Sequence, residues 1–190
     1  MKGVVIKSFE MFVAERFGEE VADLAMELPD LSSEGAYTNV GNYPHSDFLV
    51  LATDVAKQTN TPINQLVIDF GEMLFGVLAT AHADMVADYE SAIDLLSVIE
   101  SVIHQNVRKI YDNTELPQFD VIERRQDTFI HLEYRSGRPF ADLAEGLIYG
   151  CLAHYDVKHL ASITRHNIEK NGTHSSFEVT INKDAKHQPS

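Results

Sequence analysis

The stretch LASITRHNIEKNGTHSSFEVTI, residues 160–181, decides the fold class of this chain. Two runs rich in β-branched residues, 160–168 and 173–181, flank the dipeptide Asn171-Gly172. Asn-Gly between two such runs is the strongest short-range signal for a β-hairpin, because both residues tolerate a positive φ angle. The end of the chain is therefore predicted to be an antiparallel hairpin.

A second pair of strands and a connecting helix are predicted upstream of this hairpin. Residues 119–125 and 128–135 have the length and composition of strands, and they are joined near Gln126. A helix over about 140–155 then links this pair to the hairpin. The second half of the chain is thus expected to form an antiparallel sheet with a helix packed against it.

Helical periodicity dominates the first half of the chain, where apolar residues recur at three- and four-residue spacing. Helices are expected over 4–17, 46–59, 61–78 and, as one long helix, about 84–110. Gly18 follows the first helix as a stop signal, and residues 31–44 form a loop. Helices first and an antiparallel sheet later predict an α+β fold, with the helical part packed on the sheet.

The composition suits one domain with a core large enough to enclose a ligand, since 44% of the 190 residues are apolar. We expect a single domain over residues 1–181, divided into parts over about 1–60 and 61–181. The last residues, 182–190, lack an apolar pattern and are expected to form a flexible tail.

Charge and cysteine content exclude several function classes. Fifteen Lys and Arg against 29 Asp and Glu give a net charge of -14, which disfavours nucleic acid and anionic lipid as partners. Lys7 and Glu10 interrupt the first apolar run too early for a signal peptide, and no later run reaches about 18 apolar residues. A cytoplasmic protein is expected. Cys151 is the only cysteine, so neither an intrachain disulfide nor a thiolate zinc cluster can form.

Tyr134, Ser136 and Arg138 occupy alternate positions in the sequence YRSGR. In an extended segment a phenol, a hydroxyl and a guanidinium would point to the same side. Such a set suits a carboxylate, because Arg offers a bidentate charged fork and the hydroxyls orient the oxygens. The alternative is an ordinary exposed strand face, and the pattern alone leaves both interpretations open.

His104 follows Ile93 by eleven residues, about three helical turns, at the edge of the apolar stripe of the helix over 84–110. A lone histidine in such a place is either a ligand or a hydrogen-bonded core residue. Glu100, one turn earlier, could make a carboxylate and histidine pair for a metal, but no third ligand is evident. The other histidines show no HExxH motif or paired ligand spacing.

Three features with fixed separations decide between these interpretations. They are a helix ending in VIHQNVRKIY, then Leu116-Pro117 with its proline thirteen residues after His104, then a YxSxR motif thirty residues after His104. In these features, and from Met1 to the final hairpin, the chain resembles the haem nitric oxide/oxygen binding family, the sensor domain of soluble guanylate cyclases.

The resemblance implies a haem b, iron protoporphyrin IX, buried between the helical part and the sheet. It implies that His104 is the proximal iron ligand and that Tyr134, Ser136 and Arg138 hold the haem propionates. Pro117 matches the proline that presses on the porphyrin, although a rigid residue before a strand would look the same. A neutral imidazole and a carboxylate-binding set agree with these roles.

The resemblance also implies which residues line the distal side of the haem. Leu143 stands where members that hold oxygen have a hydrogen-bonding tyrosine, and Leu74 stands in place of its supporting asparagine. Further apolar lining is expected from Val5, Phe9, Leu78 and Leu147. Bound dioxygen would lack a donor there, whereas nitric oxide needs none, so nitric oxide is the expected ligand.

The resemblance implies a sensor and not an enzyme. Binding of nitric oxide would weaken the bond between the iron and His104 and shift the conformation, which a partner would read in trans. The expected partner is a sensor histidine kinase or a cyclic-dinucleotide enzyme. Other classes stay open: a haem enzyme, which would need a distal acid-base group, and a haem-free scaffold or haem carrier.

Overall fold

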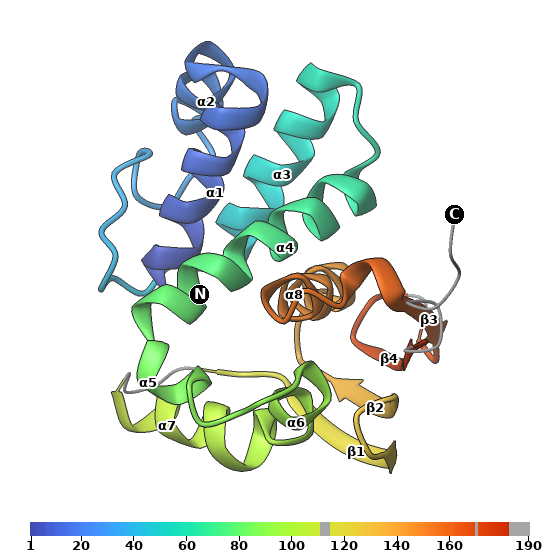
Figure 1. Ribbon diagram of the computed structural model, residues 1–190. Helices are drawn as coiled ribbons and strands as arrows, with labels where there is room; N and C mark the ends of the chain where they lie inside the picture. The colour runs from blue at the N-terminus through green and yellow to red at the C-terminus, as the bar shows by residue number, and fades with distance from the viewer. Residues whose placement is uncertain (111–114, 170, 183–190) are drawn as a thin grey trace.

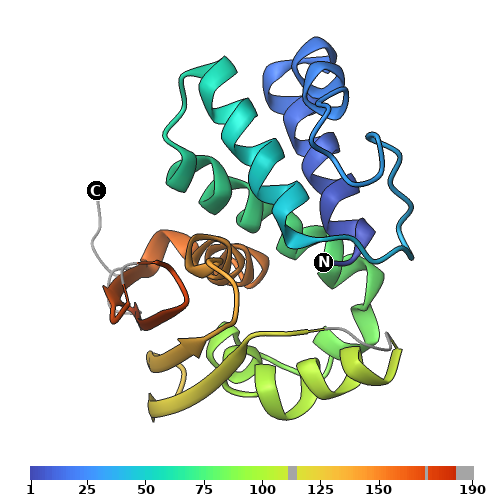
Figure 2. The same cartoon turned by 180° about the vertical axis from the view of Figure 1, so that it is seen from behind.

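The computed structural model describes residues 1–110, 115–169 and 171–182, and it confirms the predicted α+β fold (Figures 1 and 2). The N-terminal helices are α1 (Gly3–Phe17), α2 (Glu19–Met26), α3 (His45–Thr59), α4 (Ile63–Ala81) and α5 (Ala83–Val86). The rest comprises α6 (Ala92–Ser97), the π-helix η1 (Ile99–His104), α7 (Gln105–Ile110), β1 (Gln118–Arg125), β2 (Phe129–Arg135), α8 (Ala141–His154), the 3-10 helix η2 (Lys158–Leu160), β3 (Ala161–Asn167) and β4 (His174–Ile181). The predicted tail lies outside the described residues from 183 onward.

The four strands form one antiparallel sheet in the order β1-β2-β4-β3. Both predicted pairs are present, and β4 lies between β2 and β3. Gly172 has a φ of 75° in the connection before β4, and Gln126 has a φ of 44° in the turn between β1 and β2. In the register of β2 and β4, Tyr134 pairs with Ser175. The hairpin signal at Asn171-Gly172 correctly predicted that β3 pairs with β4.

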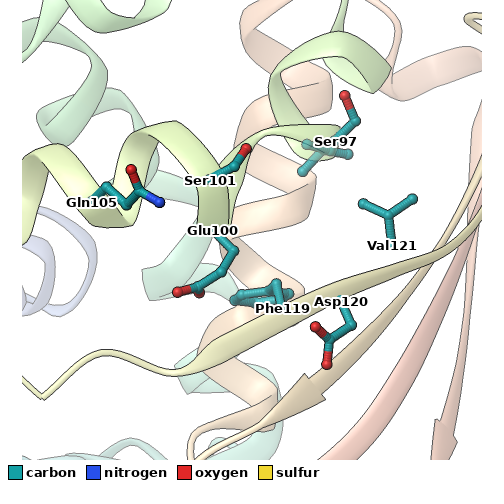
Figure 3. A pocket seen from close by; sticks show the side chains of 8 residues that line it. Ser97, Glu100, Ser101, Gln105, Phe119, Asp120 and Val121 are labelled. Carbon is teal, nitrogen blue, oxygen red and sulfur yellow. The ribbon is translucent and has the colours of Figure 1, made fainter.

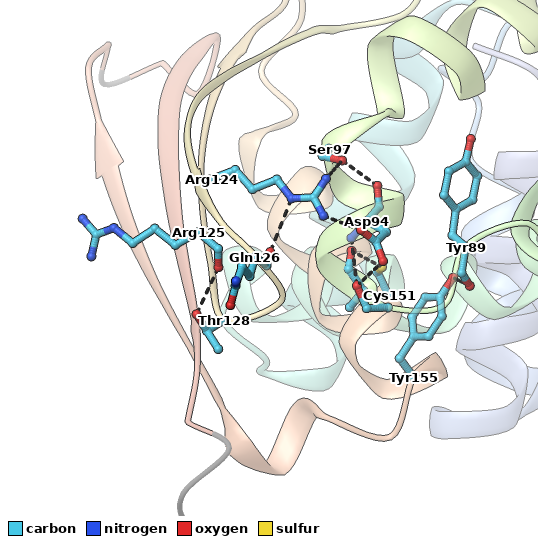
Figure 4. Close-up of polar contacts among 11 residues, drawn as sticks. Tyr89, Asp94, Ser97, Arg124, Arg125, Gln126, Thr128, Cys151 and Tyr155 are labelled. Atoms are coloured by element: carbon cyan, nitrogen blue, oxygen red, sulfur yellow. Dashed lines mark hydrogen bonds and ion pairs between the residues drawn. The ribbon is translucent and has the colours of Figure 1, made fainter.

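The predicted helix over 84–110 is wrong as a single helix, because the chain divides it into α5, α6, η1 and α7. The interruption is held by a distant side chain, since the Tyr155 hydroxyl donates to the carbonyl oxygen of Tyr89 at 3.0 Å (Figure 4). A new helix then starts, because the Ser91 hydroxyl accepts a hydrogen bond from the Asp94 N–H at 3.1 Å as an N-cap.

The helical segment after this break is tied to the first strand of the sheet. Arg124 on β1 donates to the Ser97 hydroxyl at 2.9 Å and also pairs with Asp94 (Figure 4). Beyond Ser97 the backbone widens into η1, where the N–H of Ile103 donates to the carbonyl of Val98 at 3.3 Å, five residues back. Arg124 thus fixes α6 to β1, and the π-helix η1 follows the fixed segment.

Two hydrophobic cores are joined by α8, which lies between the N-terminal helices and the sheet (Figure 1). The first core is built from α1, α3 and α4, and α8 contributes Leu143 to it. The second is built from α6, β1, β2 and β4, and α8 contributes Ala144, Ile148 and Cys151 to it. One helix therefore fixes the position of each core relative to the other.

Helices α4 and α8 approach closely because glycines face each other where they cross. A Cβ atom on Gly71 would lie 2.9 Å from the Cα of Gly146, and one on Gly146 would lie 2.1 Å from the carbonyl oxygen of Ile68. Real Cβ atoms do not approach backbone this closely. Only glycine fits at these two positions without moving the helices apart.

Helix α4 is long and apolar enough to span a membrane by length and composition. This departs from the expectation that no such stretch exists. Its two acidic residues nevertheless bind it to neighbouring elements, since Asp69 pairs with Arg16 at 2.5 Å and Glu72 pairs with Lys158. Such pairs, together with its packing on α8, are typical of a core helix.

We expect Gly146→Ala to lower the free energy of unfolding by about 1–3 kcal/mol, because the added methyl group forces α8 away from α4. Urea unfolding measures this change. Gly76→Ala is the matched control on α4, where a Cβ meets nothing within 4 Å. It should raise the stability by about 0.5–1 kcal/mol. Equal effects of the two substitutions would contradict the proposed close crossing.

Candidate cofactor site

His104 is the last residue of η1, and its imidazole lies beside the sheet. The side chain is 13% exposed, and its ring centroid lies 5.9 Å from that of Phe119 on β1. Nδ1 lies 2.9 Å from Oε2 of Glu100, one turn earlier. Burial lowers the pKa of His104 below its ordinary value, although Glu100 opposes the shift. The ring is therefore held neutral at pH 7, which is the form that binds metals.

Tyr134 and Ser136 are brought together at the end of β2. Tyr134 is 1% exposed within the second core, and its hydroxyl lies within hydrogen-bonding reach of the Ser136 side chain and the backbone of Phe140. Burial raises the pKa of Tyr134, so the phenol keeps its proton. The Ser136 hydroxyl accepts a hydrogen bond from the N–H of Arg138 at 3.0 Å.

The convergence of Tyr134, Ser136 and Arg138 thus depends on a turn. The expected extended segment is wrong beyond Arg135, where β2 ends. The N–H of Ser136 donates to the carbonyl of Thr173 at 2.8 Å, which fastens the turn to the connection before β4. The predicted residues still share one end of the sheet.

Arg138 already binds a carboxylate in this structure. Its Nη2 donates to Oε2 of Glu115 at 2.6 Å, and the Arg138 side chain is 19% exposed whereas that of Glu115 is 76% exposed. Burial, followed by the charge of Arg138, lowers the pKa of the Met1 amino group. A hollow of about 480 Å³ opens beside Glu115 and Ser136. A carboxylate supplied by a ligand would have to displace Glu115 from this guanidinium.

Pro117 lies close to His104, in the segment that leads into β1. Its carbonyl group, the only hydrogen-bonding group of a proline backbone, raises the pKa of His104 and so counters part of the effect of burial. The proline is partly buried. Pro117 and His104 are thirteen residues apart in the sequence but are neighbours in space.

The six predicted distal residues lie on the other side, in and around the first core. Phe9, Leu74 and Leu143 are buried there. The remaining three, one each on α1, α4 and α8, are only partly buried against it: Val5, Leu78 and Leu147. Phe75 and Ile103 are likewise partly buried against the second core. Each core thus leaves some of its apolar side chains only partly buried.

Several neighbours of His104 and Arg138 escaped the sequence analysis. Phe119 and Glu115 contact these residues through the tertiary fold, and no local pattern marks them. Arg108 was detectable, because its spacing of four residues from His104 and eight from Glu100 predicts one helix face. A hollow of about 340 Å³ lies between η1 and β1 and is lined by Glu100 and Phe119 (Figure 3).

Comparison with known proteins gives one family. The family model described as Haem-NO-binding matches residues 2–162. An Fe(II) unliganded H-NOX protein from K. algicida is 31% identical, with a TM-score of 0.90 over 99% of this chain and 100% of that chain. An H-NOX protein from S. oneidensis in the Fe(II)NO state is 28% identical, with a TM-score of 0.85 over 96% and 100%. The H-NOX from Shewanella woodyi in the Fe(II)CO state is 35% identical, with a TM-score of 0.79 over 96% and 95%. No curated protein matches significantly.

We expect Tyr134→Phe to lower the free energy of unfolding by about 1 kcal/mol, because the buried phenol oxygen lies near the polar groups of Ser136 and Phe140. Urea unfolding of the variant gives the value. A double-mutant cycle with Ser136→Ala should give a coupling energy of about 0.5 kcal/mol or more. Additive effects would show that the two hydroxyls do not interact.

Proposed function

Because the chain belongs to the haem nitric oxide binding (H-NOX) family, we propose that it holds a haem through His104 and senses nitric oxide for a signalling partner. One observation carries the proposal: a neutral, partly buried imidazole and Arg138, which binds a carboxylate, both contact residues of the segment 115–119. These are the two kinds of group that a haem requires, an iron ligand and a propionate partner.

The residues present fit a haem. His104 would supply the axial ligand, and Tyr134, Ser136 and Arg138 would bind the propionates, with Arg138 released from exposed Glu115. Burial raises the pKa of the only cysteine, Cys151, so a reactive thiolate for covalent attachment is lacking. This favours non-covalently held haem b. When bound, its iron supplies the site for a diatomic gas.

The apolar distal set favours nitric oxide over oxygen. Leu143 is 8% exposed and Leu74 is 2% exposed, so both belong to the first core. A leucine side chain has no polar atom and therefore offers no hydrogen-bond donor there. Dioxygen depends on such a donor more than nitric oxide does. The same set, with Val5, Phe9 and Leu147, lacks an acid-base side chain that could move protons. A sensor is therefore favoured over a haem enzyme.

We further propose that the signal reaches a separate protein in the cytoplasm, either a sensor histidine kinase or a cyclic-dinucleotide enzyme. His104 lies at the junction of η1 and α7, so a change in its position would move a helical segment that a partner can read. The net charge of -14 favours a basic patch on that partner. The Pro117 segment, which lies against His104, would be displaced with it.

Absorption spectra of the ferrous protein alone, in air and with nitric oxide test this proposal directly. We expect a five-coordinate haem that binds nitric oxide and forms no stable oxygen complex. In His104→Ala the axial bond should be lost, and added imidazole should restore the spectrum if the protein is folded. A stable oxygen complex would refute the selectivity. Purified protein that takes up no haem would favour a scaffold.

Arg138→Ala should accelerate haem transfer to apomyoglobin about 10- to 100-fold, because a charged hydrogen bond contributes about 1.5–3 kcal/mol. Arg125→Ala is the matched control, since Arg125 is 67% exposed and pairs with Glu123 at 2.6 Å. The control should leave the transfer rate unchanged. Rapid haem loss from the wild-type protein itself would favour a haem carrier.

A further inference from the structure

We propose that Glu100, held by Arg108, is a positioning residue that sets how strongly His104 binds the iron. This inference rests on the proposed function, because it concerns the axial ligand of the haem. Glu100 contacts both other side chains on one helical face, His104 four residues later and Arg108 eight residues later. It assigns a role to two residues beyond the ligand and the propionate clamp.

The carboxylate of Glu100 divides its two oxygens between different partners. Oε2 lies 2.9 Å from Nδ1 of His104, and Oε1 accepts a hydrogen bond from Nη2 of Arg108 at 2.7 Å. A neutral ring whose Nδ1 donates to Glu100 carries its free lone pair on Nε2, the nitrogen that would bind a metal. Glu100 thus selects the tautomer and the orientation of the ring.

Arg108 gives this carboxylate a charge-assisted partner, since its Nη2 donates to Oε1 at 2.7 Å. An ionised carboxylate that accepts from Nδ1 draws the proton toward itself and makes the imidazole a stronger electron donor. Arg108 withdraws negative charge from the same carboxylate. Glu100 and Arg108 therefore act on the ligand bond in opposite directions.

Access to water limits the strength of this effect. The Glu100 side chain is 31% exposed and lines the hollow of about 340 Å³ between η1 and β1 (Figure 3). The His104 ring is less exposed, at 13%, and packs against Phe119. The His104 donor is thus buried, whereas the Glu100 acceptor is partly solvated. Glu100 therefore strengthens the bond between iron and histidine only moderately, so that the bond can still break.

Resonance Raman spectra of the ferrous holoprotein test the proposal through the stretching band of the bond between iron and histidine. Glu100→Gln should shift this band to lower frequency and increase the fraction of the nitric oxide complex that has lost the histidine bond. Arg108→Met should shift the band to higher frequency and decrease the fraction of the nitric oxide complex that has lost the histidine bond. Glu100→Asp keeps the charge but shortens the side chain, so it should behave like Glu100→Gln. A shift in Glu100→Asp would show that the contact with Nδ1, and not only the charge at position 100, sets the frequency of the band.

Haem loss provides a second readout, because removal of such a partner weakens metal binding about 10- to 100-fold. Glu123→Gln is the matched control, since Glu123 pairs with Arg125 and should leave the band in place. If His104→Ala retains the band, the ligand assignment and the proposed function are wrong. If His104→Ala loses the band but the Glu100 and Arg108 variants keep the wild-type frequency, only this inference is wrong.

Discussion

The close crossing of α4 and α8 at Gly71 and Gly146 is the constraint on which the rest of the structure depends. Because no side chain separates the two backbones there, their separation is set by backbone contact. One part of α8 then packs into the helical core through Leu143, and another packs into the sheet core through Ile148. The two sides of the candidate site are therefore held at a distance that side-chain rotation cannot change.

This arrangement also explains why the site residues carry different charges. The side that the first core supplies is apolar. The side that the second core supplies carries His104, whose pKa is lowered by burial, and Arg138, whose guanidinium binds a carboxylate. Glu115 shows which chemistry Arg138 accepts, because an exposed carboxylate is bound there at 2.6 Å. Desolvation and a fixed cation thus determine what can bind.

The features that the sequence predicted correctly are local ones. The Asn171-Gly172 signal predicts a hairpin because the φ preference of two residues is enough to set it. The helix over 84–110 failed because its break depends on Tyr155, which lies 66 residues from Tyr89. The short α2 was not predicted, and its buried residues are two alanines. The motifs thirteen and thirty residues after His104 marked it as a candidate ligand. The contact of Glu115 with Arg138, in contrast, arises only in the tertiary fold.

The position of His104 at the end of a π-helix gives the candidate site a physical means of moving. A histidine in the middle of a regular helix would move only with the whole helix. Here the segment before it is widened, with the bond from Ile103 to Val98 at 3.3 Å, whereas α6 is anchored by Arg124. Displacement of His104 would therefore be absorbed in η1 and passed on to α7. The hydrogen bond from His104 to Glu100 spans the same segment, so the residue proposed to set the strength of the ligand bond lies in the part of the backbone that is easiest to deform.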